Sequence, residues 1–387
     1  MRLTLNEIPG GFASWENAIS SARAAQEGGA LLLDASGMDS MPFSALRLID
    51  RYCGPAGEDA LTGVGAELFL FLEKTGYRRR LRVRNGRRRI SLLNLPLVGE
   101  GGRSAVYRLS EDCALKVYRG EVTAEALEKS LENLRAAAEA GIPAAIPLEV
   151  AETDEGLGAV FEYLDGDLLA NRVRACPDEL DDLAKRFAGV CLKIAGARLD
   201  DGRMTCTNEF YAGALNRLSG LLSAEEIDVY ERAVRAVPLR NTAAHGDFHL
   251  RNLIVDKSGG FHLIDLDDFG RGHPVWDVAS AAMAYWLLPQ KNDNDEALIR
   301  FTGLTRAEAE RLYRVFTDEY FRSETGEEKR RRVFASETYA YVRYARMIGD
   351  LYGHAGGEGL TLAALREALS IVGARLDEAE RALVSWK

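Results

Sequence analysis

The sequence is poor in the features that mark secreted, membrane-spanning and nucleic-acid-coating proteins. Its 387 residues include only five cysteines, and no two of them form a Cys-x-x-Cys pair. An odd and scattered set of this kind argues against a disulfide framework and indicates reduced thiols in a cytosolic protein. No apolar run reaches the roughly 18 residues of a membrane span, and the N-terminal MRLTLNEIPGG lacks a signal-peptide core. We therefore expect a cytoplasmic protein that does not enter a membrane.

An excess of positive charge and a metal-ligand spacing are also missing. Asp and Glu, at 59, outnumber Lys and Arg, at 49, and the net charge of −10 argues against a chain that coats nucleic acid. The five histidines form no metal-ligand spacing. What is present, 47% hydrophobic and 28% charged residues, is typical of a globular protein, and the length allows two or three domains.

Strand and helix patterns alternate over residues 1–80. The strand patterns are RLTL, ALLLDA and DALTGV, and the helical patterns are SWENAISSARAAQEGG, PFSALRLIDRYC and AELFLFLEKTG. This β-α-β-α-β-α order predicts a small parallel or mixed sheet flanked by helices.

An arginine-rich segment follows this first domain. Eight arginines lie between Arg78 and Arg89, and the Asn85-Gly86 pair among them favours a two-residue hairpin turn. We interpret residues 81–94 as a solvated hairpin that joins two domains, with its arginines paired to acidic side chains. An anion-binding patch is the alternative, and the lack of interleaved aromatic residues argues against a nucleic-acid partner.

The pattern changes again at residue 95. The stretch LPLVGEGGRSAVYRLSEDCALKVY predicts three antiparallel strands, residues 123–140 a helix, and LGAVFEYLDG a further strand. From about residue 166 the chain is mostly helical, apart from a strand pair around residues 253–266.

A glycine-rich turn in this region is typical of a phosphate site. Gly99, Gly101 and Gly102 lie between two strands, with Ser104 directly after them. Glycine lets the backbone approach phosphates closely and offer its amide hydrogens. The signal is weak by itself, because many such turns are only hairpins.

A buried lysine strengthens the indication of a phosphate site. Lys116 lies inside the apolar strand ALKVY, where an unpaired ammonium group would be costly and therefore needs an anion. Phosphates or a glutamate of the next helix would serve. Glu128 and Glu132 lie four residues apart on one helical column, so periodicity does not choose between them.

The strongest motif is HGDFHLRN. It separates Asp247 from Asn252 by four residues, as in the kinase catalytic loop H-R-D-x-x-x-x-N. Asp247 would accept or orient the proton of an attacking hydroxyl, and Asn252 would offer a carbonyl oxygen to magnesium on the nucleotide phosphates.

Three aspartates in FHLIDLDDFGRG compete for the same metal. A hairpin with its turn over Lys257–Gly260 places Asp265 directly opposite Asn252, close enough to share an ion. A turn at the last two glycines of that segment places Asp267 there instead. Neither turn suits Asp268, which opens a literal Asp-Phe-Gly. We predict Asp265 as the metal ligand and Asp267 as the second choice.

Residues from about 96 to 387 resemble the aminoglycoside phosphotransferase and choline kinase superfamily. The stretches that carry the resemblance are GEGGRSAVY, ALKVY, FEYLDG, HGDFHLRN and LIDLDDFGRGHPVWDVA, in this order. The resemblance implies a bilobal protein-kinase-like fold, with an N-lobe over residues 95–165 and a mostly helical C-lobe over 166–387. It also implies ATP and Mg²⁺ as cofactors.

The resemblance assigns roles to single residues. Lys116 would pair with the nucleotide, and the distance to GIPAAIP favours Glu132 as its partner. The backbone at Glu162 and Leu164 would meet adenine, and Asp265 would bind magnesium.

Two further positions follow from the same resemblance. Asp277 would be a buried aspartate that supports the catalytic loop. Arg251 stands where such proteins often have glycine, beside the predicted site, and so is expected near substrate or phosphate.

Residues 1–80 resemble, more weakly, a STAS domain, the fold of anti-sigma-factor antagonists. The matching stretches are ALLLDASGMDSMPFSALRLID and AELFLFLEKTGYRRRL. The Asp-Ser pair that is phosphorylated in many such domains is replaced here by Pro42-Phe43, which argues against a phosphorylation switch. The expected fold class is therefore α/β plus α+β, with a STAS-like domain that is able to bind a protein partner.

The acceptor is expected to be a small hydroxyl compound. His249 stands where Ser/Thr protein kinases have lysine, and neither a long activation segment nor an Ala-Pro-Glu sequence follows. Aromatic residues of the helical region would suit a cationic acceptor, although core packing is the more usual role of aromatic residues at helical spacing. The sequence thus predicts an ATP-dependent small-molecule phosphotransferase. The alternative is a regulatory fusion that binds or phosphorylates a protein.

Overall fold

The computed structural model describes most of the chain in two compact units. The described residues are 2–9, 11–26, 30–53, 59–83, 87–101, 104–120, 122–199, 204–292, 294–355 and 362–386. The N-terminal unit comprises Met1–Glu132 and Ala145–Tyr163, and the C-terminal unit comprises Asn133–Ala144 and Leu164–Lys387. Within the described residues, no helix is long and apolar enough to cross a membrane.

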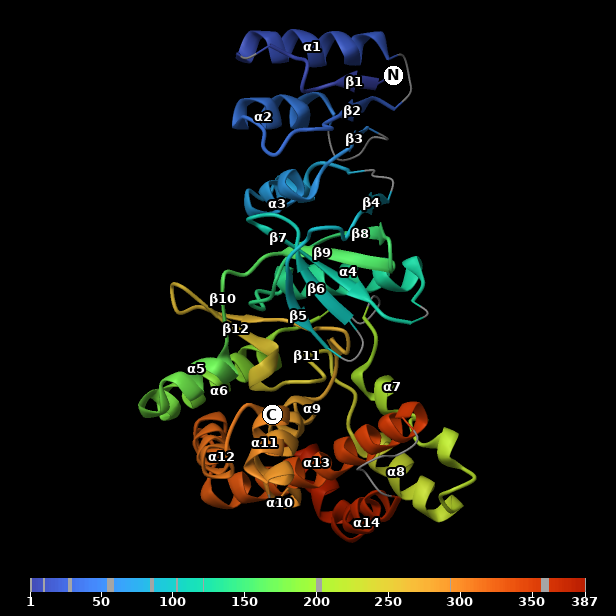
Figure 1. Cartoon of the computed structure of the whole chain (residues 1–387), viewed down its shortest axis with the longest axis vertical. Coiled ribbons are helices and arrows are strands. Elements are labelled where there is room, and N and C mark those ends of the chain that lie inside the picture. The colour runs from blue at the N-terminus through green and yellow to red at the C-terminus, as the bar shows by residue number, and fades with distance from the viewer. Residues whose placement is uncertain are drawn as a thin grey trace. The chain divides into compact units, whose positions relative to one another are not determined.

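The chain begins with a three-stranded parallel sheet and three helices (Figure 1). The elements are β1 (Arg2–Thr4), α1 (Phe12–Ala25), β2 (Leu32–Asp34), α2 (Phe43–Tyr52), β3 (Ala60–Thr62) and α3 (Ala66–Lys74). The sheet order is β1-β2-β3, and both pairings are parallel. The predicted alternation of strands and helices is therefore confirmed.

A six-stranded sheet forms the rest of the N-terminal unit, in the order β4-β8-β9-β7-β6-β5. Its strands are β4 (Arg88–Ile90), β5 (Leu97–Glu100), β6 (Ser104–Arg108), β7 (Cys113–Tyr118), β8 (Pro147–Thr153) and β9 (Gly156–Glu162). The pairings of β5, β6 and β7 are antiparallel, as predicted. Helix α4 (Ala124–Glu139) begins in this unit and ends in the C-terminal one.

The flanks of the predicted arginine-rich hairpin are paired with other segments of the chain. The short helix η1 (Tyr77–Arg79) lies before the segment, Val83 bridges to Leu61, and β4 pairs in parallel with β8. Both flanks of the predicted turn are thus paired elsewhere, and the turn itself lies outside the described residues. An Asn-Gly pair favours a hairpin only when no other strand competes for its flanks.

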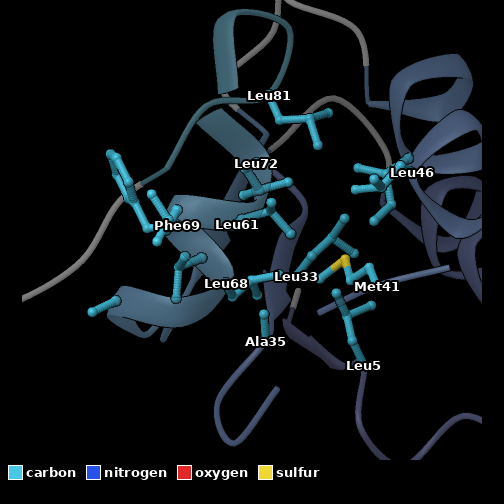
Figure 2. Packing of buried hydrophobic residues seen from close by; sticks show 14 of the residues in the cluster. Leu5, Leu33, Ala35, Met41, Leu46, Leu61, Leu68, Phe69, Leu72 and Leu81 are labelled. Carbon is cyan, nitrogen blue, oxygen red and sulfur yellow. The ribbon is translucent and has the colours of Figure 1, made fainter. Parts of the chain in front are cut away.

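The two sheets of the N-terminal unit share one hydrophobic core. Leu115 and Val117 of β7 and Val160 of β9 belong to the same buried cluster as Leu33 of β2 and Leu61 of β3. Figure 2 shows part of this cluster, including the labelled Leu68, Phe69 and Leu72 of α3.

Helix α3 is buried around most of its circumference. Its buried residues are Ala66, Leu68, Phe69, Leu70 and Leu72. A helix that is apolar all round must be covered on more than one side, and α3 contacts β8 of the six-stranded sheet as well as belonging to the first one. The N-terminal domain and the sheet that carries Lys116 are therefore packed as one body.

The C-terminal unit is mostly helical. Its α-helices are α5 (Leu169–Ala175), α6 (Leu180–Gly196), α7 (Thr207–Tyr211), α8 (Ala224–Ala236), α9 (Val275–Ala282), α10 (Leu288–Lys291), α11 (Asp295–Thr302), α12 (Arg306–Tyr320), α13 (Gly326–Ala355) and α14 (Leu362–Val384). Helix α13 packs on α14 and α9, and α12 packs on α6. A π-helical turn, η5 (Met283–Leu287), joins α9 to α10.

Short strands of this unit carry the predicted motifs. They are β10 (Gly166–Leu168), β11 (Ala243–Ala244), β12 (Leu253–Asp256), β13 (Phe261–Leu263) and β14 (Gly270–Arg271). The predicted hairpin exists, because β12 pairs antiparallel with β13.

The hairpin register differs from the prediction by one residue. Val255 lies opposite Phe261, and the Ile264 N–H donates to the Asn252 carbonyl at 2.9 Å, so Asn252 faces Ile264 rather than Asp265. The cause is the turn, where the Asp256 carboxylate accepts hydrogen bonds from the N–H groups of Ser258 and Gly260, at 2.8 Å each. This side-chain turn closes a three-residue loop, whereas the prediction assumed an even number.

Candidate active site

The HGDFHLRN loop starts directly after β11, and hydrogen bonds to Asp277 of α9 support its first residues. The Asp277 carboxylate accepts the N–H groups of His245 and Gly246, both at 2.9 Å, and its side chain is 2% exposed. Burial raises the pKa of Asp277, while His245 and the two hydrogen bonds oppose that rise. The predicted supporting role of Asp277 is confirmed.

Gly246 fixes the loop against the segment that carries Asp265, Asp267 and Asp268, called here the aspartate segment. Its φ of +82° lies in the left-handed region, and a Cβ there would lie 2.5 Å from the Asp268 carbonyl oxygen. Only glycine fits both conditions, so the loop backbone and residue 268 are packed in direct contact.

Asp247 lies at the centre of a polar cluster. Its Oδ1 accepts the Arg343 Nη2 at 2.7 Å, and its Oδ2 lies 3.3 Å from both the His249 Nε2 and the Asn252 Nδ2. The side chain keeps 38% of its surface exposed. One carboxylate oxygen is thus fixed by a guanidinium group, while the other makes only longer contacts.

The electrostatic surroundings keep Asp247 ionised. Burial by itself raises the pKa of its carboxyl group, but the His249 imidazole and the Arg343 guanidinium outweigh that effect. The pKa of Asp247 is consequently held well below its usual range. Such a carboxylate is a good hydrogen-bond acceptor and a weak proton acceptor.

Asn252 is buried and oriented by the same loop. It ends the short helix η4 (Leu250–Asn252), and its Nδ2 donates to the Asp247 carbonyl at 2.8 Å. Because the Asn252 Nδ2 donates within the loop, the Asn252 Oδ1 is the atom that is able to act as a metal ligand.

The three aspartates differ in their surroundings. Asp265 and Asp267 are exposed, whereas Asp268 is half-buried and pairs with Arg346 at 3.2 Å. Asp265 has a φ of +55°, a left-handed conformation that is costly for a residue with a side chain. The role of Asp265 as a metal ligand stays a prediction.

The glycine-rich turn has the predicted form where the structure describes it. Gly99 pairs with Val106 across β5 and β6, and the Gly101 N–H donates to the Ser104 carbonyl at 2.9 Å. Gly102 lies outside the described residues. Ser104 opens β6, opposite Tyr118.

Lys116 lies on the side of β7 opposite to the shared core. Leu115 and Val117 point into that core, so alternation along the strand turns Lys116 to the other face. Its Nζ lies 5.0 Å from the centre of the Tyr118 ring, and its side chain is half-buried.

The two candidate glutamates of α4 are both exposed. Glu128 pairs with Arg87 at 3.2 Å, and Glu132 forms no ion pair with any residue that the structure describes. The pairing of Lys116 with Glu132 stays a prediction.

Glu162 and Leu164 fall on either side of the division between the units. Glu162 ends β9, opposite Cys113, and its side chain pairs with Lys74 of α3 at 2.9 Å. Its N–H donates to the Ile146 carbonyl within the sheet. Leu164 opens the second part of the C-terminal unit. Their contact with adenine stays a prediction.

Sequence reasoning missed two arginines of α13. Arg343 binds Asp247, and Arg346, one helical turn later, binds Asp268 and lies 4.8 Å from the ring centre of Tyr211. The signal was present as a pair of arginines three residues apart in a helix of apolar and aromatic residues, where charged groups need buried partners.

Arg251 and two of the aromatic residues make contacts within the C-terminal unit, and the expected place of Arg251 near substrate stays a prediction. Arg251 is exposed and donates to the Arg300 carbonyl of α11. Tyr285 is fully buried, and its hydroxyl accepts the Leu250 N–H at 2.7 Å. Trp276 is fully buried as well. Core packing explains these aromatic residues, and a cationic acceptor stays a prediction.

Comparison with known proteins is consistent with this geometry. The sequence matches the phosphotransferase enzyme family (APH) over residues 95–314, more than half of the chain. No curated protein matches it.

Several solved structures are similar to the chain at low sequence identity. Aminoglycoside phosphotransferase APH(4)-Ia, in a ternary complex with ADP and hygromycin B, is 13% identical with a TM-score of 0.50, over 74% of this chain and 94% of that one. A choline/ethanolamine kinase family protein from Mesorhizobium loti is 17% identical with a TM-score of 0.47, over 76% and 92%. The streptomycin–ATP–APH(2″)-IIa ternary complex is 15% identical with a TM-score of 0.46, over 72% and 93%. Together with its kinase-like fold and helical C-terminal region, the family match shows that the chain belongs to the phosphotransferase enzyme family (APH).

Proposed function

We propose that the protein transfers the γ-phosphoryl group of ATP to a hydroxyl of a small molecule. The observation that carries this proposal is the Asp247 cluster, in which a supported loop presents one oxygen of an ionised carboxylate beside Asn252. This is the arrangement that phosphoryl transfer requires, because the reaction depends on positioning and charge neutralisation more than on strong base chemistry.

Asp247 would orient the acceptor hydroxyl. Since its pKa is held low, the carboxylate is charged at neutral pH and accepts a hydrogen bond from the hydroxyl. A weakly basic carboxylate suits a loose transition state, because the acceptor hydroxyl loses its proton late in such a reaction.

The residues near Asp247 fit a magnesium ion. Asn252, Asp265 and Asp267 offer only oxygen ligands, which Mg²⁺ prefers, and magnesium commonly takes one or two carboxylates together with substrate phosphates. The described residues hold no group of three or more His, Cys, Asp or Glu side chains arranged for a metal, so the phosphates would complete the set. When bound, the ion would neutralise charge on the transferred phosphoryl group.

The N-terminal unit would supply the nucleotide contacts. Gly99, Gly101 and Ser104 would cover the phosphates, and Lys116 would pair with them. In support, the face of β7 that carries Lys116 is the one not occupied by the shared core.

The acceptor class rests on the short path from the aspartate segment to α9. Only β14 and a few residues separate Phe269 from Val275, which leaves no platform for a peptide. The fold is shared with a phosphotransferase whose structure contains hygromycin B, and this supports a small hydroxyl compound without naming it.

The decisive experiment is magnesium-dependent ATP consumption across a panel of hydroxyl compounds. Asp247→Asn should abolish turnover and spare ATP binding, because the amide cannot hold the hydroxyl as a charged acceptor does. Asp165→Asn is the matched control, since Asp165 is an exposed residue of the same unit, and it should keep full activity. Wild-type turnover in the Asp247→Asn protein would refute the proposal.

A regulatory role of the N-terminal domain is the second candidate. The shared core and the Lys74–Glu162 pair tie this STAS-like domain to the sheet that would hold the nucleotide. A protein bound to residues 1–80 would therefore act on nucleotide affinity. Specific capture of a protein, without turnover on any hydroxyl compound, would favour this role over the first.

A further inference from the structure

A buried arginine far from the catalytic motif contacts the predicted catalytic aspartate. Arg343 lies on α13 with 8% of its surface exposed, and its Nη2 donates to the Asp247 Oδ1 at 2.7 Å. Its Nη1 donates to the Gly246 carbonyl and to the Tyr211 hydroxyl. Three separate acceptors thus hold one guanidinium group.

The anchoring of Arg343 is rigid. It lies within α13, a helix that spans Gly326–Ala355 and packs on α9 and α14. Tyr211, which accepts from it, is fully buried and stacks on Trp276 with ring centres 3.8 Å apart. A planar group with several fixed donors determines the orientation of its partner, which a lysine does less well.

This geometry has a direct consequence for Asp247. Because Arg343 holds both the Oδ1 of the carboxylate and the carbonyl of the preceding residue, rotation of the Asp247 side chain would break a charge-assisted hydrogen bond. The Oδ2 is left to face an acceptor, with only 3.3 Å contacts to His249 and Asn252.

We propose that Arg343 is a positioning residue, which orients Asp247 so that its Oδ2 meets the acceptor hydroxyl. This inference rests on the proposed function and extends it to a residue outside the catalytic loop. Arg343 acts through Asp247 and makes no contact with the reacting groups itself. A structural role, as a brace between α13 and the loop, is the competing explanation.

Kinetics of three variants separate the two explanations. In Arg343→Met, kcat should fall by at least about 30-fold while ATP affinity changes less than about threefold, because only orientation is lost. Arg343→Lys keeps a charge without the planar fork, so its kcat should lie between those of Arg343→Met and the wild type. Arg332→Met is the matched control. Arg332 is a buried arginine of the same helix, 2% exposed, that pairs with Glu324, and its loss should lower thermal stability and leave kcat within about threefold.

A double-mutant cycle gives the decisive readout. If Arg343 acts through Asp247, adding Arg343→Met to Asp247→Asn should reduce the residual phosphate release from magnesium ATP by less than about threefold. A brace would instead give losses that multiply. Multiplying losses, or wild-type kcat in Arg343→Met, would overturn the proposal.

Failure of the proposed function would look different from failure of this inference. It would show as no turnover by the wild type on any hydroxyl compound, or as full turnover by Asp247→Asn, and either result would overturn both claims. All assays are run well below the melting temperature of each variant, so that a loss of folding does not count as a loss of orientation.

Discussion

The core shared by the N-terminal domain and the six-stranded sheet leads to a strong prediction about Leu72→Ala. Leu72 of α3 is fully buried and belongs to the same cluster as Leu115 of β7. Truncating a fully buried leucine to alanine costs about 2–5 kcal/mol, depending on how far the cavity collapses. For a unit of roughly 150 residues, a loss of about 3 kcal/mol lowers the melting temperature by about 6–12 °C.

The part of the structure that loses stability in Leu72→Ala is more informative than the total loss of free energy of unfolding. If α3 serves both sheets, hydrogen exchange in Leu72→Ala should increase in β7 and β9 as well as in β1–β3, since one core stabilises all of them. The assay is hydrogen exchange by mass spectrometry, together with urea unfolding to obtain the free energy of unfolding. Leu93→Ala is the control, because Leu93 is 78% exposed and should change neither.

Two results would refute the shared core. The first is faster exchange confined to residues 2–83, with β7 unchanged. The second is a free energy of unfolding within about 0.5 kcal/mol of the wild type, the range of surface substitutions. Either would mean that residues 1–80 fold as a separate domain on a linker.

Three further predictions follow from single residues. Gly246→Ala should lower turnover at least about 100-fold without weakening ATP binding, measured by calorimetry, because its Cβ would lie 2.5 Å from the Asp268 carbonyl at a φ of +82°. Burial raises the pKa of the Cys113 thiol to about 11, so at pH 8 Cys113 should react with a thiol reagent much more slowly than the half-buried Cys176, and equal rates would contradict this. Burial lowers the pKa of His273 to about 3. In the unfolded chain the same imidazole binds a proton near pH 6.5. The contribution of His273 to the free energy of unfolding is therefore fully present above pH 6.5 and falls below it by up to about 1.4 kcal/mol per pH unit. Urea unfolding from pH 7 to 4 should show a shallower fall in His273→Gln than in the wild type, and parallel curves would contradict the assignment.

The sequence predicted the elements and the local motifs well, because both depend on neighbouring residues. The strands of the glycine-rich region, the helix after ALKVY and the β12–β13 hairpin all follow from periodicity and turn residues. Asp247 and Asn252 are five positions apart, and one short loop brings them into hydrogen-bond contact.

Two differences between the predicted and the observed strand pairing have specific physical causes. The hairpin register failed because the Asp256 side chain, through hydrogen bonds to Ser258 and Gly260, selects a three-residue loop. In the arginine-rich segment, β4 pairs with β8, a strand far along the chain, while the predicted turn lies outside the described residues. Tertiary pairing overrides local turn preference in the second case, and a side chain sets the turn in the first.

The contacts that sequence reasoning missed join residues distant in the chain. Arg343 meets Asp247, and Lys74 meets Glu162, across long sequence separations. No periodicity or spacing encodes such pairs. The only sequence signal is a charged residue in a largely apolar segment. Such a residue indicates that it has a polar or charged partner, but the sequence does not identify that partner.

The proposed catalytic loop is held by groups from separate segments, and each constrains a different part of it. Asp277 of α9 fixes the N–H groups, Arg343 of α13 fixes the Asp247 carboxylate, and Gly246 sets the distance to the aspartate segment. Phosphoryl transfer needs this redundancy, because an error of about 1 Å in the acceptor costs about 100-fold in rate. Under the proposed function, the motif would supply the reacting groups, and the long-range contacts would hold those groups in position.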